Sequence, residues 1–184
     1  MENIFNRNII PSNDFERIAA LKRYHVINAF DDPILDQIVQ LTAKKFESPM
    51  ALISLVDLNH VFFRSGIGLS GAESTSRGRS LCSIAILDSE PLIIHYAKEE
   101  KCLLTNPVIV AEYGFKFYAS APLITSDGFM IGTLCITDTK LREFSAEQVE
   151  SLKGFAEMVI QEIEKKERLK NIVNTEDQLE VLEK

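Results

Sequence analysis

The chain has 184 residues, 46% of them hydrophobic and 26% charged, which fits one globular domain with a short appendage. Its net charge of −7 argues against a nucleic-acid or anionic-lipid partner, because both are attracted by a basic face. No run approaches the roughly 20 apolar residues that span a bilayer, so we expect no membrane partner either.

Two helices are predicted at the start of the chain, after a polar tail over residues 1–13 that lacks the apolar region of a signal peptide. Asn13 and Glu16 have the spacing of a helix-capping pair, and apolar residues follow at helical intervals to about Val26. Residues 31–33 supply an acidic cap and a proline for a second helix, which we expect to run to about Glu47.

The hydrophobic pattern then changes to that of strands. Residues 50–56 read as a buried strand rich in β-branched and aliphatic side chains, and residues 60–65 return as a second strand after a short turn. Residues 66–78 are rich in Gly, Ser and Thr and are interpreted as a loop. Glycines 66, 68 and 71 have the GxGxxG spacing, but no apolar helix follows them, as a dinucleotide site requires.

The second half of the predicted sheet follows several short segments: a helix over 81–87 capped by Ser80, a strand over 91–94, and mixed loop and helix over 98–113. Residues 115–124 and 129–137 read as paired strands, because Asp127-Gly128 supplies the chemistry of a tight hairpin turn. Hairpin-joined strands indicate an antiparallel sheet, and helices at both ends of the chain can cover one of its faces. The sequence therefore predicts an α+β fold.

A long helix closes the domain. Ser145 and Gln148 form a capping box, and an apolar seam follows with the spacing of about two heptads: Val149, Leu152, Ala156, Val159 and Ile163. The seam residues pack either in the core of the same chain or in a dimer interface. It stops at Lys166, and Thr175 begins a separate short helix. We therefore expect a tail over 1–13, a domain over 14–168 and a helical extension over 169–184.

The cysteines are the candidates for chemistry. Cys82, Cys102 and Cys135 are odd in number and include no CxxC pair, so we expect a reduced, cytoplasmic chain rather than a disulfide framework. Cys82 follows Arg77 and Arg79 at the start of a predicted helix, and both features favour its thiolate. It is either a redox- or electrophile-sensitive thiol or a small buried core residue. The three histidines are far apart, and no metal site is expected.

Four stretches resemble the GAF domain family, as found at the N-terminus of bacterial histidine kinases and diguanylate cyclases. They are residues 16–36, Ala51-Leu-Ile-Ser-Leu-Val-Asp57 with Phe62-Phe-Arg-Ser65, Ser80-Leu-Cys82 with Ala85-Ile86, and residues 106–138. The resemblance implies a central antiparallel sheet of five or six strands. The N- and C-terminal helices lie on one face of that sheet, and a pocket of loops and short helices lies on the other.

The resemblance also implies a set of pocket residues. They are Phe63, Ser80, Cys82, Ile86, Asn106, Tyr113, Phe117, Tyr118 and Ser120. The chain departs from the family where relatives carry a histidine (Ile84), a tryptophan (Phe62) and an acidic residue (Gly78), which makes the cavity less polar. The cyclic-nucleotide signature and the bilin-anchoring Cys-His pair of some relatives are absent.

These observations predict a regulatory or sensory module rather than an enzyme. It binds an unidentified small molecule without a cofactor, forms a homodimer through its terminal helices and acts on a separate signalling effector. One alternative is a purely structural dimerisation domain that binds no ligand. Another is a free methionine sulfoxide reductase, a thiol chemistry that some stand-alone GAF proteins perform with three cysteines.

Overall fold

The computed structural model describes residues 2–27, 32–68, 71–95 and 114–182, with side chains described up to residue 172. Their strands form one six-stranded sheet of order β3-β2-β1-β6-β5-β4, in which every neighbouring pair is antiparallel. The strands are β1 (Met50–Val56), β2 (His60–Ile67), β3 (Ser74–Ser76), β4 (Leu92–His95), β5 (Phe117–Ile124) and β6 (Met130–Asp138). The helices are α1 (Asp14–Arg23), α2 (Pro33–Lys45), the 3-10 turn η1 (Arg77–Arg79), α3 (Cys82–Ala85) and α5 (Ala146–Leu182). The predicted α+β class and antiparallel sheet are confirmed.

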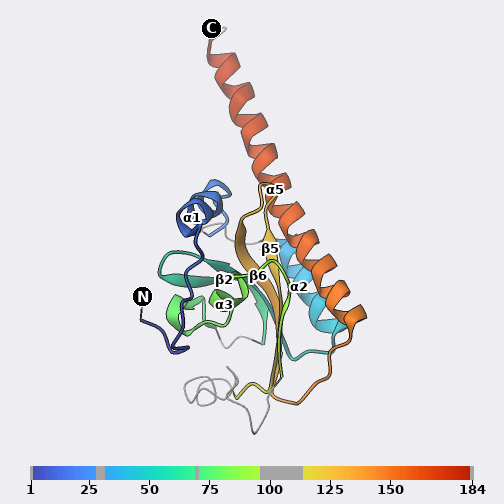
Figure 1. The fold of residues 1–184 in the computed structure, drawn as a ribbon. Helices are drawn as coiled ribbons and strands as arrows, with labels where there is room; N and C mark the ends of the chain where they lie inside the picture. Colours follow the sequence, from blue (N-terminus) through green and yellow to red (C-terminus); the bar gives the residue numbers. More distant parts are fainter. Residues whose placement is uncertain (1, 28–31, 69–70, 96–113, 183–184) are drawn as a thin grey trace.

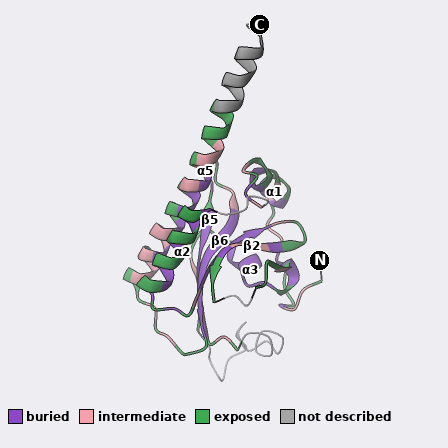
Figure 2. Ribbon diagram, turned by 180° about the vertical axis from the view of Figure 1, so that it is seen from behind, coloured by how far each residue is buried: buried purple, intermediate pink, exposed green. Residues whose placement is uncertain are grey.

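The two faces of the sheet carry different layers. The helices α2 and α5 lie side by side on one face, and α3 lies on the other (Figure 1). Successive residues of a strand point to opposite faces, so β1 gives Ile53 and Leu55 to the core under the helices and Leu52 and Val56 to a second cluster. Figure 2 shows buried residues throughout the central strands, which explains why their sequences are almost continuously apolar.

The observed starts of α1, α2 and α5 can be compared with the capping residues predicted from the sequence. Asp32 accepts a hydrogen bond from the Leu35 amide at 3.3 Å, and Pro33 stands in the first turn of α2, as predicted. The capping box of α5 is reciprocal, with both Ser145–Gln148 hydrogen bonds present. Asn13 stands at the N-cap of α1, which begins at Asp14 as predicted, but its side chain makes no capping hydrogen bond and the helix ends at Arg23.

The closing helix is longer than predicted. It runs without interruption from Ala146 to Leu182 and projects beyond the sheet (Figure 1), so the predicted break after Lys166 is wrong. Residues 166–182 contain neither Gly nor Pro, and Lys166 forms ion pairs with Asp32 and Glu162. Four of the five predicted seam residues, Leu152, Ala156, Val159 and Ile163, are buried in the core under the helices, and Val149 is half-buried. The seam therefore packs against its own domain.

The segment 66–78, predicted to be a loop, contributes to the sheet. β2 extends to Ile67, and the short edge strand β3 pairs with it, with Val61 opposite Thr75. β3 has only three residues, Ser-Thr-Ser, and none of them is buried. Such a segment carries no hydrophobic alternation, so this strand could not be predicted from its residues.

The N-terminal residues pack on the second face of the sheet. Phe5 and Ile9 are buried in the cluster that contains Cys82, and the Ile4 amide donates to the Gly78 carbonyl at 3.1 Å. A Cβ atom at Gly78 would lie 2.5 Å from the Glu2 carbonyl oxygen. The missing side chain at Gly78 thus leaves room for the N-terminal backbone.

A buried charge cluster joins α1 to the sheet. The Asp14 carboxylate lies 2.8 Å from Nε of Arg17 and 2.8 Å from both terminal nitrogens of Arg77. Arg17 also donates to the Val56 carbonyl at the end of β1. Burial raises the pKa of Asp14, but the hydrogen bonds from Arg77 and Arg17 outweigh it and the pKa is lowered. In the part of the chain that the structure describes, no helix is long and apolar enough to cross a membrane.

Candidate functional site

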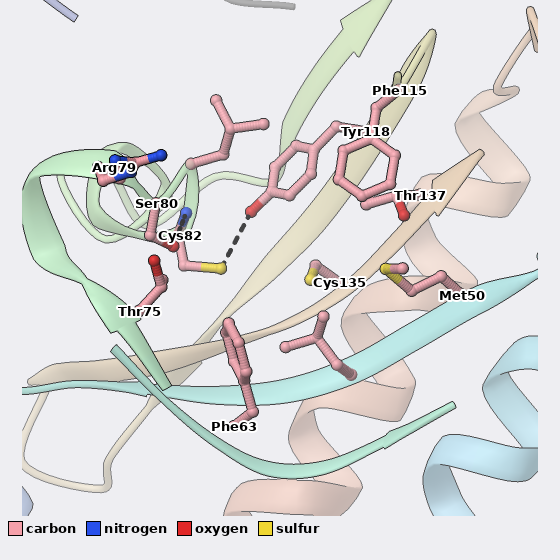
Figure 3. Close-up of a pocket in the computed structure, with 12 residues that line it drawn as sticks. Met50, Phe63, Thr75, Arg79, Ser80, Cys82, Phe115, Tyr118, Cys135 and Thr137 are labelled. Carbon is pink, nitrogen blue, oxygen red and sulfur yellow. Dashed lines mark hydrogen bonds between the residues drawn. The ribbon is translucent and has the colours of Figure 1, made fainter. Parts of the chain in front are cut away.

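A cavity of about 60 Å³ lies on the sheet face opposite α5, next to α3 (Figure 3). Its walls are mostly apolar side chains and sulfur atoms, with a few polar groups. The lining residues are Met50, Leu52, Phe63, Thr75, Arg79, Ser80, Leu81, Cys82, Phe115, Tyr118, Cys135 and Thr137. The volume accommodates a few waters or a small molecule, and it is smaller than a typical drug-sized site of roughly 300–1,000 Å³.

Strand register builds the floor of the cavity. Thr137 of β6 stands between Met50 of β1 and Tyr118 of β5. Two residues before Thr137 in β6, Cys135 stands opposite Leu52 of β1. All five side chains project to one face because residues two apart in a strand share a face.

The short helix α3 carries Cys82 over this floor. The Ser80 hydroxyl accepts a hydrogen bond from the Cys82 amide at 3.3 Å, which supports the predicted role of Ser80 at the start of this helix. The Ser83 hydroxyl donates to the Arg77 carbonyl at 2.7 Å and ties α3 to η1. The Tyr118 hydroxyl donates to the Cys82 sulfur at 3.6 Å, so β5 and α3 meet at this thiol (Figure 3).

Cys82 and Cys135 form a buried pair of free thiols, 4% and 1% exposed. The neighbouring Cys135 thiol is the largest cause that lowers the pKa of Cys82, to about 5. The hydroxyls of Ser54, Thr133 and Tyr118 lower this pKa further, against the effect of burial. Donation to Cys82 and burial raise the pKa of Cys135 well above its ordinary value. The two opposite shifts favour Cys82 over Cys135 as the thiolate of the pair.

The reason for this thiolate differs from the one predicted. From the sequence, Arg77, Arg79 and the start of a helix were expected to favour the Cys82 thiolate. Arg77 is fully buried and turns its guanidinium to Asp14, whereas the groups that lower the pKa of Cys82 come from β1, β5 and β6. Arg79 does line the cavity.

One polar group of the cavity has no partner among the described residues. Thr137 is 3% exposed, and its Oγ1 makes no hydrogen bond there. Buried hydroxyls are almost always hydrogen-bonded, so an unpartnered one that faces a cavity marks a position where a ligand atom or a water is expected.

The structure brings four of the predicted pocket residues together and places three elsewhere. Phe63, Ser80, Cys82 and Tyr118 line the cavity. Phe117 belongs to the core under the helices, where its ring packs 5.4 Å from that of Phe144, because it neighbours Tyr118 in the strand and points the other way. Its prediction as a pocket residue is thereby corrected.

Two further predicted residues are buried on the cavity side of the sheet without lining the cavity. Ile86 is fully buried in the cluster that contains Cys82. The Ser120 hydroxyl lies near that of Tyr118 and lowers its pKa, yet it forms no hydrogen bond of good geometry. Asn106 and Tyr113 lie outside the described residues, as does Cys102.

Sequence reasoning missed several lining residues, among them Met50, Thr75, Cys135 and Thr137. Cys135 and Thr137 share a face of β6, but β6 is buried on both faces, so its sequence does not show which residues face the cavity. In the part of the chain described, no group of three or more His, Cys, Asp or Glu could hold a metal ion.

The comparisons with known proteins agree with this architecture. A family model described as GAF domain matches residues 32–163. A cyclic di-GMP phosphodiesterase of Pseudomonas aeruginosa is 32% identical over 154 residues, which cover 83% of this chain and 26% of that protein. The chain therefore spans about a quarter of the length of this relative.

Two solved structures show the same fold. One is a type II free methionine-R-sulfoxide reductase from Thermoplasma acidophilum, with a TM-score of 0.57 and 17% identity over 71% of this chain and 89% of that one. The other is the GAF domain of an Acinetobacter phosphoenolpyruvate-protein phosphotransferase, with a TM-score of 0.60 and 16% identity over 85% and 98%. The family match over most of the sequence and the fold lead to one conclusion: the chain belongs to the GAF domain family.

Proposed function

We propose that this chain is a regulatory, sensory module that binds a small molecule in the cavity and passes its state on through α5. The observation that carries the proposal is that the cavity and α5 share two strands. Tyr118 and Cys135 face the cavity, while their neighbours Phe117, Leu134 and Ile136 belong to the core that packs against α5. A shift of β5 or β6 at the cavity therefore also moves the side chains that pack against α5.

The shape of α5 suits this role. Its 37 residues form one continuous helix, about 55 Å long at 1.5 Å per residue. A ligand moves such a helix only if it binds two arrangements of the sheet with different affinity. Interiors are close-packed, so the core between β5, β6 and α5 has few intermediate arrangements and favours two discrete ones.

The cavity indicates the chemistry of the ligand. Leu52, Phe63 and Phe115 offer apolar contacts, and the Thr137 hydroxyl offers a hydrogen bond with no competing partner among the described residues. We therefore expect a small, largely apolar molecule with one polar group directed at Thr137. The module acts by binding rather than by catalysis.

A second surface supports the proposed homodimer. A groove between α2 and α5 is lined by Ile34, Leu41 and Met158, which are 43%, 45% and 47% exposed. Exposed Leu169 and Ile172 continue on the same side of α5, 11 and 14 residues after Met158, which is close to a whole number of helical turns. A second copy that covers this stripe would join two α5 helices. The effector is then either a separate protein or another region of the same polypeptide.

Ligand binding is tested by native mass spectrometry of the full chain purified from its own host. We expect a retained small molecule that Thr137→Val weakens by about tenfold, the effect of one lost hydrogen bond to a buried group. Thr139→Val is the matched control, because Thr139 is exposed just after β6. If no mass is retained and a metabolite library does not shift the melting temperature, the purely structural dimerisation domain replaces this proposal.

The presence of Cys82 and Cys135 in one cavity also favours a second candidate, a free methionine sulfoxide reductase. This activity needs an attacking thiolate and a resolving thiol, and the cavity holds one of each. A thioredoxin-coupled assay with free methionine sulfoxide separates the two functions. We expect no turnover above that of a chain with both cysteines replaced, and sustained turnover would favour the reductase.

A further inference from the structure

The proposed binding role leaves the two thiols of the cavity without a use. We propose that Cys82 and Cys135 are a peroxide-reactive pair, in which Cys82 attacks a small hydroperoxide and Cys135 then closes a reversible disulfide. This reaction is independent of the ligand and of Thr137, so it goes beyond the binding function.

The geometry supports the pairing. Cys82 lies at the start of α3 and Cys135 in the middle of β6, and both residues line the same small cavity (Figure 3). Both sulfur atoms are sheltered from bulk solvent, yet both residues line the cavity. A volume of about 60 Å³ admits a molecule the size of hydrogen peroxide and excludes bulky oxidants.

The surroundings distinguish the roles of the two thiols. The Cys82 sulfur accepts a hydrogen bond from the Tyr118 hydroxyl at 3.6 Å. Cys135 and the hydroxyls of Ser54 and Thr133, which hydrogen-bond to each other at 2.8 Å, also favour its thiolate. The low pKa of Cys82 follows from these donors, while Cys135 keeps its proton. Among the residues that the structure describes, the titratable or charged groups around Cys82 are Cys135 from β6, Tyr118 from β5 and Arg79 from η1. Thiolates, not thiols, attack peroxides, so Cys82 is the nucleophile.

The reaction balances with hydrogen peroxide as the oxidant. The Cys82 thiolate attacks one peroxide oxygen, the O–O bond breaks, and the departing hydroxide takes a proton and leaves as water. The Cys135 sulfur loses its proton and attacks the Cys82 sulfenic acid. The S–O bond then breaks, that oxygen leaves as a second water, and the S–S bond forms. Two thiols are oxidised by two electrons, and one peroxide is reduced to two waters.

A disulfide at this place has a structural consequence. Its two sulfur atoms lie about 2.05 Å apart, closer than a thiol–thiol contact allows, so α3 is drawn toward β6. β6 is also one of the strands that pack against α5. Oxidation of the pair therefore acts on the same strand as the proposed ligand.

The test is peptide mapping of the full wild-type chain after exposure to hydrogen peroxide at pH 6. We expect a Cys82–Cys135 disulfide, formed about tenfold faster than Cys82 is oxidised in the urea-unfolded chain. That factor is the gain in thiolate fraction from the lowered pKa, reduced by the lower nucleophilicity of a less basic thiolate.

Three variants identify the roles. In Cys135→Ser, oxidation is expected to stop at a Cys82 sulfenic acid that dimedone traps. Cys82→Ser is expected to form no disulfide. Cys102→Ser is expected to retain the Cys82–Cys135 bond. The wild-type map needs none of these variants, so a folding defect in one of them does not decide the outcome. A reduced pair under peroxide that oxidises the unfolded chain, or a disulfide that uses Cys102, overturns the proposal. Either result leaves the ligand experiment unaffected.

Discussion

Asp14 compensates the charge of two buried guanidinium groups. Arg17 and Arg77 are both fully buried, and Asp14 is the carboxylate that hydrogen-bonds to each of them. Because Arg77 lies 63 residues after Asp14, this cluster fixes α1 and η1 against the end of β1. A buried charge that loses its partner is far more costly than an exposed one.

We expect Asp14→Ala to lower the free energy of unfolding by about 3–5 kcal/mol, since it leaves two buried cations without their carboxylate. Urea unfolding followed by circular dichroism measures this change. Glu150→Ala is the matched control, because the Glu150–Lys153 ion pair is exposed and is expected to contribute less than about 1 kcal/mol. Similar losses in the two variants would contradict the role given to Asp14.

The same carboxylate makes stability depend on pH. The pKa of Asp14 in the folded chain is lowered below its ordinary value of 3.8, so its contribution is fully present above that value and is lost as the pH falls through the folded pKa. We therefore expect the stability difference between wild type and Asp14→Asn to shrink as the pH falls from 5 towards 3. Unfolding free energies at a series of pH values test this, and a constant difference would count against it.

At the scale of elements, the sheet depends on close approach between its central strands β1 and β6. Gly132 of β6 pairs with Leu55 of β1, and a Cβ atom there would overlap the carbonyl oxygen of Ser54. Gly154 of α5 is a different case, since a Cβ atom there would meet nothing within 4 Å. Alanine at position 132 therefore tests how closely the two strand backbones approach, whereas alanine at position 154 tests helix propensity.

We expect Gly132→Ala to destabilise the fold by about 1–3 kcal/mol or more, because strand backbone must move to admit the methyl group. Gly154→Ala is expected to stabilise it by about 0.5–1 kcal/mol, because alanine loses less backbone entropy in a helix. Thermal unfolding of both variants measures the two signs. A neutral Gly132→Ala would show that β1 and β6 approach less closely than described.

At the scale of the whole molecule, the apolar stripe on α2 and α5 is not covered by any described part of the chain. The face of α5 that carries Leu152 and Val159 is buried in its own core, so a partner can use only the other face, which carries Met158, Leu169 and Ile172. One face of α5 therefore packs in the core of its own chain, and the other face is available to the proposed partner copy.

We expect the full chain to be a dimer, and the double variant Met158→Glu, Leu169→Glu to be a monomer with unchanged helix content, because it places like charges on both sides of the contact. Light scattering coupled to size-exclusion chromatography gives the masses. Phe15→Glu is the control, since Phe15 is an exposed apolar residue, 84% accessible, on α1 outside the groove. A monomeric wild type, or a dimer that tolerates the double variant, would rule out this interface.

Much of the fold was predictable because its signals act over a few residues. The two hairpins follow from apolar runs separated by short turns, and the α2 and α5 starts follow from caps at Asp32 and Ser145. The site was predictable in part. Phe63, Ser80, Cys82 and Tyr118, predicted by resemblance, line the cavity, whereas Phe117 points to the other face because β5 is apolar on both.

The sequence by itself determined the strands other than β3, the starts of α2 and α5 and the α+β class, since alternation, turn chemistry and capping depend on neighbouring residues. Only the tertiary structure decided that Cys135 faces Cys82, that Asp14 meets Arg77, and that α5 continues past Lys166. The first two contacts join residues more than 50 positions apart, and strand register and packing bring them together. The third was open because charged residues at the end of a seam permit a helix to stop or to continue, and an ion pair with Asp32 holds Lys166 in the continuing helix.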